Sequence, residues 1–449
     1  MVGSKVAPNF YHAATRHSFR SVQMDPNYVD ASTQPTSFKR YPKFYRRFPL
    51  DLSQSIHSFL YHTSAITFQK MYREGAHALR VNPSAGALFP TEIYVQLRGI
   101  SGLLDGIYHF EIETNSLTLI YELIDDGLEG YLTDSRLIKG CLFVVSCVYF
   151  RSSWKYKNRS LRYCFLDAGH HLGAIAASAY AHDRAVELLF DFDQAAINDE
   201  LGFETKEFAT AMVISGTRKA KLIRRLRSPL PVVSGTDYFE PNRFVEEGYQ
   251  HTLTASTLCV LPPASSPSPV CLDQARFLQA IQTRRSARRF QPDAIPKEAW
   301  LTVQTVLQEA IPAHHAENLA VYTVVQAVAA VEPGLYLADR PLKLGNFREQ
   351  MGYLCVNQAI ARDAAVVFFF VAEAQNYRIA LQLAGFLGQR IYLTATYLHL
   401  GCSGIGAFFD DETQTFLETE GCVLYAVAIG YDPALDSIPT HEKSFPLPG

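Results

Sequence analysis

The chain shows the same order of apolar and polar segments twice. Each time, an apolar strand precedes a Gly-x-Tyr turn, and then come a fully apolar strand, a helix rich in small residues and a strand that ends in glycine. The separation between matching positions shrinks steadily along the chain, as expected for a duplication followed by loop deletions. Two unrelated α/β domains that share common turns are the alternative. The predicted strands are 92–97, 142–148 and one ending at 216 in the first half, and 321–325, 364–370 and one ending at 430 in the second.

The predicted helices have the periodicity of buried elements. Leu387, Ile391 and Ala395 recur at four-residue spacing, so they form an apolar stripe on a helix expected to start near Gly388. The matching helix of the first half is expected to start near Gly169, and its small residues let helices approach closely. Apolar strands between such helices predict an α+β fold with a layered α/β core, in which two domains each have a central sheet covered by helices.

A chain of 449 residues is too long for one compact core, which favours two domains. A segment rich in proline and serine, ending in Pro262-Pro263-Ala-Ser-Ser-Pro-Ser-Pro, favours extended conformations and marks a linker. The first forty-odd residues are polar and turn-forming, so we expect them to be loosely structured. The predicted boundaries are a lead-in at 1–44, a first domain at 45–228, a linker at 229–271 and a second domain with its tail at 272–449.

Charge and cysteine content narrow the functional classes. A net charge of −3 gives no general attraction to nucleic acid or to an anionic membrane, so neither is expected as a partner. The eight cysteines form no C-x-x-C pair and suggest buried thiols of a reducing compartment. The chain starts without an apolar signal region, and the apolar stretch 364–372 is too short to span a bilayer. We therefore expect a cytoplasmic protein.

An arginine-rich turn is the strongest local signal. Arg284, Arg285, Ser286 and Arg288 follow a short predicted helix, and an Ile-Pro pair begins the next one. Several guanidinium groups beside a hydroxyl suit a dianionic phosphate, because they offer charge-assisted and bidentate hydrogen bonds. Taken alone, such a turn is more often a solvated surface.

A glycine-rich segment follows the long helix of the second half. Gly404, Ile405 and Gly406 precede an acidic Asp-Asp-Glu helix start. Glycines permit positive φ angles and expose backbone N–H groups, which suits a flat ligand that needs a hydrogen-bond donor. An ordinary helix C-terminus followed by a turn is the alternative.

A third segment, in the first half, combines Arg80 with Pro83, Ser84, Ala85 and Gly86. Small residues in a row let the backbone approach a flat ligand, and an arginine can stabilise negative charge that develops on it. The alternative is a tight loop that leads into the next strand.

These three motifs resemble those of the nitroreductase family of FMN-dependent enzymes. The Arg-Arg-Ser turn with its Ile-Pro pair resembles the signature at the start of these enzymes, and 404–406 resembles the loop along their flavin ring. The 83–92 segment resembles the motif of the SagB-type branch, whose members oxidise azoline rings in modified peptides. The resemblance implies that FMN is held by Arg284, Arg285, Ser286, Arg288, Pro83, Ser84, Ala85, Gly86, Arg80, Gly404, Ile405 and Gly406. The chain departs from the family in one respect. Family members often have a second basic residue for the FMN phosphate after the last strand, but residues 430–436 contain none, so His441 or Lys443 would have to take that role.

Two further segments resemble the same branch. The Lys155-Tyr156 pair precedes an Arg-Tyr…Asp-Ala-Gly-His helix, and the resemblance implies that these two residues are the acid and base candidates. Oxidation of an azoline ring releases a hydride and a proton, and a lysine or a tyrosine can take that proton. A solvated loop lysine is the alternative. The segment 11–18 resembles the branch's lead-in, for which the sequence offers no role.

The motifs of the two halves are complementary. The first half lacks the Arg-Arg-Ser turn and the Gly-Ile-Gly loop, whereas the second half has Ile311-Pro-Ala-His-His in place of Pro-Ser-Ala-Gly and no Lys-Tyr pair. Family members are generally homodimers with FMN at the interface. If the halves pack as such a pseudo-dimer within one chain, they form one composite FMN site and a second site that is empty.

Histidines and basic runs receive simpler interpretations. His170 and His171 are adjacent on a helix and point in different directions, and His12 and His17 are wrongly spaced for one helix face, so we predict no metal site. The run 218–227 is predicted to be a solvated helix face.

Three functions are compatible with the sequence. The first is an FMN-dependent dehydrogenase that acts on a modified peptide or a small heterocycle, with dioxygen or NAD(P)H as redox partner. The second is an NAD(P)H-dependent nitro- or quinone reductase, and the third is a non-catalytic protein that binds flavin or a peptide.

Overall fold

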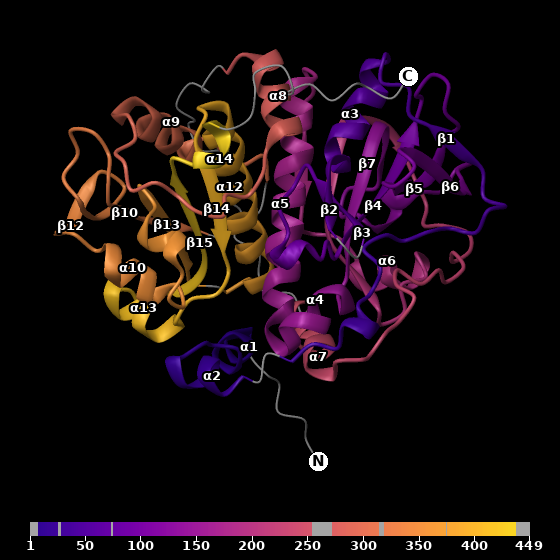
Figure 1. Cartoon of the computed structure of the whole chain (residues 1–449). Coiled ribbons are helices and arrows are strands. Elements are labelled where there is room, and N and C mark those ends of the chain that lie inside the picture. The colour runs from indigo at the N-terminus through magenta and orange to yellow at the C-terminus, as the bar shows by residue number, and fades with distance from the viewer. Residues whose placement is uncertain are drawn as a thin grey trace.

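The computed structural model contains two antiparallel sheets, one in each half of the chain (Figure 1). It describes residues 8–25, 28–72, 75–253, 272–313, 318–373 and 375–436. Within these residues the first sheet has the strand order β1-β6-β5-β4-β7-β9-β8, and the second has the order β12-β11-β10-β13-β15-β14. Leaving β1 aside, the six strands of each sheet follow one another in the same spatial and chain order. This is the arrangement that the duplication hypothesis predicts.

The strands of the first sheet include the apolar segments that the sequence singles out. The central strands β4 and β7 pair from Thr91 opposite Cys147 to Arg98 opposite Gly140, and β4 is buried throughout whereas β7 is buried from Cys141 onward. A separate hairpin, β2–β3, stands outside this sheet. The strand bounds are β1 Arg47–Pro49, β2 Ile66–Tyr72, β3 Gly75–Arg80, β4 Thr91–Arg98, β5 Gly106–Glu111, β6 Ser116–Glu122, β7 Arg136–Val148, β8 Glu187–Leu189 and β9 Glu207–Leu222.

The second sheet is smaller and has a fully buried centre. Every residue of β13 is buried between β10 and β15, because apolar side chains on both faces pack against helices. The bounds are β10 Ala320–Val325, β11 Gly334–Leu337, β12 Arg340–Leu344, β13 Val366–Ala372, β14 Gly401–Ile405 and β15 Cys422–Gly430. The predicted α+β fold, with two helix-covered sheets, is confirmed.

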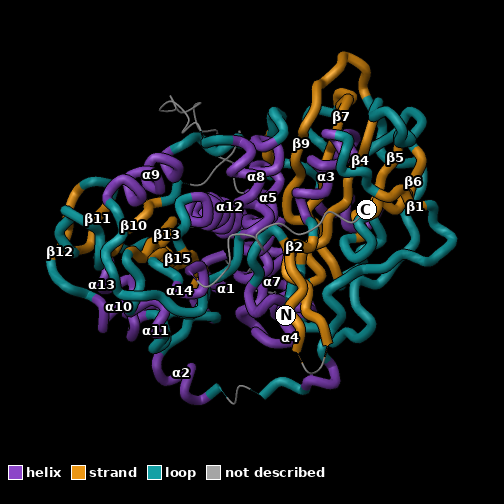
Figure 2. The backbone as a smooth tube through the Cα atoms, turned by 45° about the horizontal axis from the view of Figure 1, so that its top comes forward, coloured by secondary structure: helices purple, strands orange, loops and turns teal. Residues whose placement is uncertain are grey.

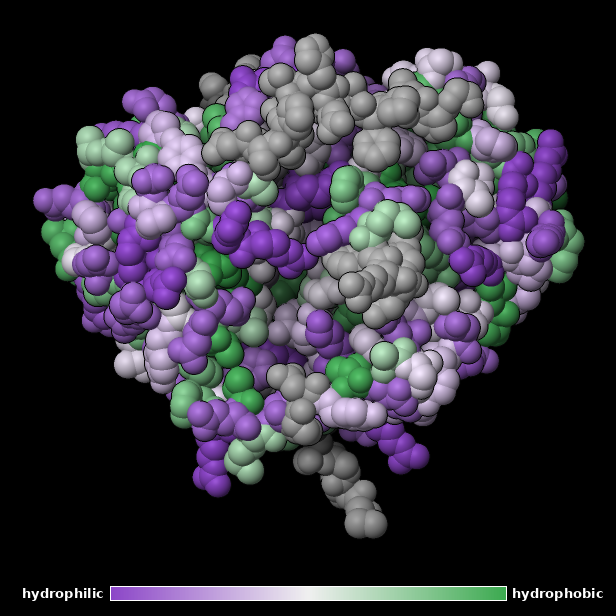
Figure 3. Space-filling view, viewed as in Figure 1, coloured by the Kyte–Doolittle hydropathy of each residue, from purple (hydrophilic) through white to green (hydrophobic). Residues whose placement is uncertain are grey.

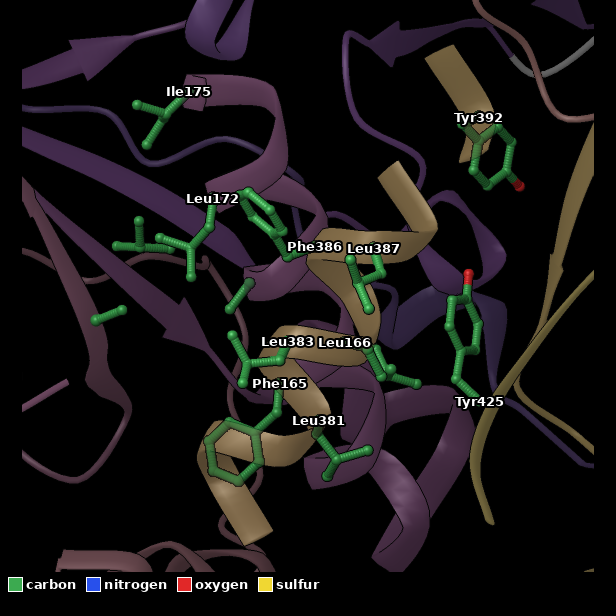
Figure 4. Close-up of a cluster of buried hydrophobic side chains, with 14 of the residues drawn as sticks. Phe165, Leu166, Leu172, Ile175, Leu381, Leu383, Phe386, Leu387, Tyr392 and Tyr425 are labelled. Carbon is green, nitrogen blue, oxygen red and sulfur yellow. The ribbon is translucent and has the colours of Figure 1, made fainter. Parts of the chain in front are cut away.

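Two long helices lie side by side between the sheets, α5 (Ser160–Ala181) from the first half and α12 (Tyr377–Tyr397) from the second (Figure 1). Both helices start earlier than the sequence predicts. Their first turns contain polar residues that interrupt the apolar pattern, yet these residues are buried as well. Apolar side chains of the two helices form one continuous core (Figure 4). Those labelled there are Phe165, Leu166, Leu172 and Ile175 of α5, and Leu381, Leu383, Phe386 and Leu387 of α12.

Glycines set how closely α5 and α12 approach. A Cβ atom on Gly169 would lie 2.0 Å from the Gln382 carbonyl oxygen, and one on Gly385 would lie 2.2 Å from the Leu166 carbonyl oxygen. Neither neighbour can yield, because each is backbone of the facing helix. The small-residue pattern of these helices therefore permits a direct backbone contact between the halves.

Shorter helices cover the outer faces of the sheets and the ends of the central pair (Figure 2). Their bounds are α1 Pro8–Ala14, α2 Phe19–Met24, α3 Ser55–Ser64, α4 Phe150–Tyr156, α6 Gln194–Glu200, α7 Arg243–Leu253, α8 Gln274–Thr283, α9 Lys297–Gln308, α10 Arg348–Leu354, α11 Ala359–Arg362, α13 Asp410–Leu417 and α14 Pro433–Asp436. Among the described residues, no helix combines the length and the apolar character needed to cross a membrane.

Two expectations about local structure were wrong, and a third is not tested. The lead-in is not loosely structured over 8–24, because it forms α1 and α2. The predicted linker includes α7, whose Val245 and Tyr249 are buried against the first half, and its Pro/Ser-rich part lies outside the described residues. The run from Arg218 onward is not a helix face, because β9 continues to Leu222 in register with β7, and Arg218 pairs with Glu187 across 2.6 Å.

We expect Gly169→Ala to destabilise the whole chain by about 3 kcal/mol or more, because its methyl group would force α5 and α12 apart. Urea unfolding monitored by circular dichroism measures the loss. Gly102→Ala is the control, since Gly102 has a φ of +81° and nothing within 4 Å of a Cβ, and backbone strain alone costs about 1 kcal/mol. Equal losses in both variants would contradict the close-contact interpretation.

Candidate active site

The motif residues of both halves meet at one side of the α5–α12 pair. The first half contributes the segment after β3 and the end of α4, and the second contributes β14 and the turn after α8. The face of the molecule that carries β14 and the β2–β3 hairpin is hollowed between the two halves (Figure 3). We define the candidate site as Pro83–Gly86, Lys155-Tyr156, Arg284–Ser286 and Gly404–Gly406.

The Pro83–Gly86 loop is held by a buried carboxyl group of α5. Ser84 Oγ donates to Asp167, and the Ala85 N–H donates to Asp167 Oδ1 over 3.2 Å. Ser84 Oγ in turn accepts the Phe89 N–H at 2.9 Å. Gly86 adopts a φ of +63°, a conformation that glycine takes at little cost. The loop therefore has one fixed shape, and its small residues are partly exposed.

Lys155 and Tyr156 lie beside this loop. A Cβ atom on Gly86 would lie 2.7 Å from the Tyr156 hydroxyl oxygen and 3.4 Å from Lys155 Nζ. The Tyr156 ring packs against Tyr163, with ring centroids 4.3 Å apart. Burial and the neighbouring Tyr163 raise the pKa of the Tyr156 hydroxyl, so this group stays protonated at neutral pH. The end of α4 thus places an amine and a phenol against the glycine of the loop.

The Gly404–Gly406 segment belongs to the other half but reaches the same place. A Cβ atom on Gly406 would lie 2.3 Å from the Tyr163 ring, and one on Gly404 would lie 1.9 Å from the Tyr425 hydroxyl oxygen. The expectation of positive φ angles here was wrong, because Gly401–Ile405 is strand β14 paired with β15. These glycines are required by the close approach of tyrosine side chains rather than by a turn.

The arginine-rich turn connects the halves. Arg284 is buried and donates to the carbonyl oxygens of Val81 and Arg80, at 2.9 and 3.0 Å. Arg285 donates to the Thr67 carbonyl oxygen at 2.6 Å and to its hydroxyl at 3.0 Å, so it fastens the β2–β3 hairpin. Burial and the adjacent Arg284 lower the pKa of the Arg285 guanidinium to about 9.

Ser286 joins this turn to β14. The Ser286 hydroxyl is hydrogen-bonded to the Tyr392 hydroxyl at 3.0 Å. The Tyr392 hydroxyl also accepts a hydrogen bond from the Gly404 N–H at 2.6 Å. Backbone pairing between Ser286 and Cys402 holds the turn against the strand edge. The Gly404 N–H that the sequence offers to a ligand is therefore engaged within the protein in this structure.

The side chains of two of the predicted cofactor residues make no hydrogen bond to the other candidate residues in the part of the chain that the structure describes. Arg80 is fully buried between the rings of Phe38 and Phe89 and donates to the carbonyl oxygens of Thr91 and Ser37. Arg288 is exposed beyond the turn. The Arg80 side chain thus binds backbone carbonyl groups next to the Pro83–Gly86 loop, and the exposed Arg288 side chain has no hydrogen bond to that loop among the described residues.

Sequence reasoning missed a polar stripe on α5. Tyr163, Asp167 and His170 recur at intervals of four and three residues, so they share one face of an otherwise apolar helix. Tyr163 donates to the Gly406 carbonyl oxygen at 3.2 Å, and His170 Nε2 is hydrogen-bonded to the Tyr425 hydroxyl at 2.8 Å. Helical spacing of polar residues within a buried helix was the signal that could have found this stripe.

Both histidines of the pair at 170–171 are buried and hydrogen-bonded. His171 Nδ1 lies 2.9 Å from the Thr91 hydroxyl oxygen. Burial lowers the pKa of each imidazole to about 3, so both are neutral. Within the described ranges, no group of three or more His, Cys, Asp or Glu side chains is arranged to hold a metal ion.

The matching region of the second half has a different geometry. There the segment that replaces Pro83–Gly86 pairs directly with the sheet edge, since the Leu188 N–H donates to the Pro312 carbonyl oxygen at 2.7 Å and Leu188 bridges Ala313. By contrast, no backbone hydrogen bond joins Pro83–Gly86 to β14 in the part of the chain that the structure describes. We call each place where a loop faces a sheet edge a slot. The slot at Leu188 is closed by this backbone pairing, whereas the slot between Pro83–Gly86 and β14 has no such pairing and is called the open slot.

The open slot offers one unpaired donor to an anionic cofactor such as FMN. Arg284 Nη1 is buried and has no hydrogen-bond partner among the described residues, so a guanidinium N–H remains for a phosphate or a carbonyl group. The side chains of Tyr156, Tyr425 and Tyr163 pack against Gly86, Gly404 and Gly406, so a larger residue at these positions would displace them. His441 and Lys443 lie outside the described residues.

Asp167 makes a pH prediction possible, because burial raises the pKa of its carboxyl group to about 7, despite the opposing hydrogen bonds from Ser84 and Ala85. A group whose folded pKa lies above the unfolded value stabilises the fold at low pH, and that contribution is lost as the pH rises from about 4 to about 7. Relative to Asp167→Asn, the wild-type free energy of unfolding should therefore fall by up to about 4 kcal/mol over this window. Urea unfolding of both proteins across pH 4–8 measures it, and parallel curves would contradict the raised pKa.

Comparisons with known proteins concern the family and the fold. Residues 281–431 match the sequence profile of the nitroreductase family. The fold matches that of a putative nitroreductase from Anabaena variabilis ATCC 29413 with a TM-score of 0.76 and 25% sequence identity, covering 94% of this chain and 99% of the other. A putative nitroreductase of Methanocaldococcus jannaschii is 27% identical over 125 residues, which are 24% of this chain and 62% of that relative, so less than two thirds of its length is matched. The second half thus resembles the nitroreductase family in sequence, and nearly the whole chain resembles a putative nitroreductase in fold.

Proposed function

We propose that this protein is an FMN-dependent oxidoreductase with one composite flavin site, and that its substrate is an azoline ring in a modified peptide or a related small heterocycle. The observation that carries this proposal is the meeting of Gly86, Lys155 and Tyr156 of the first half with Gly404–Gly406 and the Arg284 turn of the second. Neither half alone has both sets of residues.

The side chains around the open slot have distinct roles in this proposal. When bound, FMN supplies a hydride acceptor or donor. Arg284 offers its remaining N–H to an anionic group of the cofactor. Asp167 holds the loop that forms one wall through Ser84 and Ala85.

Proton transfer is assigned to Lys155 and Tyr156. Oxidation of an azoline ring removes a hydride and, from the neighbouring atom, a proton that needs a base. Tyr156 stays protonated because burial raises its pKa, so it suits a hydrogen-bond donor, whereas Lys155 is exposed and suits the exchange of a proton with solvent. Lys155 is therefore the proposed base.

A second candidate is an NAD(P)H-dependent nitro- or quinone reductase, which the nitroreductase-family match favours. The two candidates share the flavin site and differ in the reductant and the oxidant. NADPH alone would reduce the flavin of a nitro- or quinone reductase, whereas an azoline dehydrogenase takes its electrons from the azoline and passes them to dioxygen or another acceptor.

We expect one FMN per chain, because the slot of the second half is closed by the Leu188–Pro312 hydrogen bond. Flavin released by denaturation of purified protein, quantified by absorbance against protein concentration, measures this ratio. Arg284→Met should lower the flavin content, and Arg276→Met is the control because Arg276 is a partly exposed arginine of the preceding helix. A ratio of two would refute the single-site proposal.

We expect Lys155→Ala to lower the rate of azoline-dependent flavin reduction by about 100-fold or more, since general-base catalysis contributes about that much. Stopped-flow absorbance of the enzyme-bound flavin with a thiazoline-containing peptide measures this rate. Lys219→Ala, which changes an exposed lysine on the far end of β9, should leave it unchanged. Unchanged reduction in Lys155→Ala, together with normal flavin content, would exclude Lys155 as the base.

A further inference from the structure

The N-terminal segment 11–18 is packed between the two halves, although the sequence gives it no role. Tyr11 and His12 are buried, and the Tyr11 ring stacks on Phe244 of α7 with centroids 5.2 Å apart. The Tyr11 hydroxyl accepts the Leu161 N–H at the start of α5 over 3.2 Å. At its other end, the His17 carbonyl oxygen accepts the Asp410 N–H of α13 over 3.0 Å. The segment thus joins the first turn of α5 to the first turn of α13.

A buried carboxylate, Asp410, lies at the centre of this junction. Its oxygens accept hydrogen bonds from Arg162 at 2.7 Å, from Arg159 at 3.0 Å and from the His17 N–H at 2.8 Å. The two arginines hold the pKa of the Asp410 carboxyl group well below its usual range, so it is ionised. Burial and Arg162 lower the pKa of the nearby His12, which is therefore neutral.

The N-terminal segment completes the hydrogen bonding of both arginines. Arg162 donates to the His12 carbonyl oxygen at 2.6 Å and to the Thr15 hydroxyl at 2.9 Å, and Arg159 donates to the Thr15 carbonyl oxygen. Two buried guanidinium groups face one carboxylate here, so the carbonyl groups of the segment are needed to satisfy their remaining N–H groups. Without the segment, Arg159 and Arg162 would lose these partners.

Arg159 connects this network to the candidate site. Its Nη2 donates to the Gly406 carbonyl oxygen at 3.1 Å, and its guanidinium lies over the Phe408 ring. Gly406 also accepts from Tyr163, whose ring packs on Tyr156. The position of the Gly404–Gly406 wall therefore depends on where Arg159 is held.

We propose that the N-terminal segment is an integral part of the flavin site, and that Arg159 is a positioning residue. The segment and Asp410 fix Arg159, and Arg159 fixes the Gly406 carbonyl, so the second-half wall keeps its distance from the Pro83–Gly86 loop. The inference rests on the proposed function for the identity of the ligand. It extends the site by a segment far from it in sequence.

Three full-length variants test this proposal. Arg159→Met removes every hydrogen bond of the guanidinium at similar side-chain length, and Arg159→Lys restores a cation with fewer donors. Arg16→Ala is the matched control, because Arg16 belongs to the same segment but pairs with the exposed Asp411. The affinity for FMN is measured by quenching of flavin fluorescence on titration of apoprotein, together with the visible spectrum of bound flavin and the Tm of the apoprotein.

Arg159→Met should weaken FMN binding by at least tenfold and shift the visible spectrum of any flavin that binds. Arg159→Lys should recover part of the affinity for FMN. Arg16→Ala should match the wild type in both affinity and spectrum. Wild-type affinity and spectrum in Arg159→Met would overturn the inference. A lowered Tm without a change in affinity or spectrum would also overturn it, because it would show a structural role alone.

Hydrogen exchange of the backbone amides of 404–408 separates failure of this inference from failure of the proposed function. If wild-type protein binds no FMN, the proposed function fails, and faster exchange of these amides in Arg159→Met still supports the positioning role. Unchanged exchange in that variant would refute it independently of any ligand.

Discussion

The direct backbone contact between α5 and α12 sets the distance between the two sheets. Gly169 and Gly385 let each helix pack against a carbonyl oxygen of the other, so the pair behaves as one rigid layer shared by both halves. Every segment of the candidate site is attached to this layer, either directly on α5 or through β14 and the turn after α8. A separation changed by one methyl group would move all of these segments at once.

The same helix pair carries a large number of buried polar groups. Arg162, Asp167 and His170 lie on a helix whose other faces pack into the apolar core, and each is satisfied by a partner from another segment. Such groups stabilise the fold little, because their desolvation offsets most of the gain, but they allow only one arrangement of the partners. These buried polar groups therefore specify how the loop, the strand and the N-terminal segment are placed around the core, while the apolar side chains supply the stability.

Periodicity predicted the elements better than it predicted their ends or their contacts. The central strands and the two long helices followed from apolar spacing, since burial on both faces leaves that trace in a sequence. The path of β9 beyond Gly216 was missed, because its exposed basic residues pair with β7 through the backbone and leave no apolar pattern. The motifs pointed to the Arg284–Ser286 turn as a ligand-binding segment, whereas in the structure Arg284 and Arg285 donate to backbone carbonyl groups of the other half. Contacts of that kind depend on tertiary packing and have no local signature.

The closed slot at Leu188 and Pro312 has a consequence for how such a protein can change over time. In a dimer of identical chains, every substitution occurs in both sites, so one site cannot be lost while the other is kept. When the two halves are different segments of one chain, a substitution that closes one of the two slots leaves the other intact. The half with the closed slot can then exchange ligand contacts for backbone pairing, while the other half keeps its own contacts.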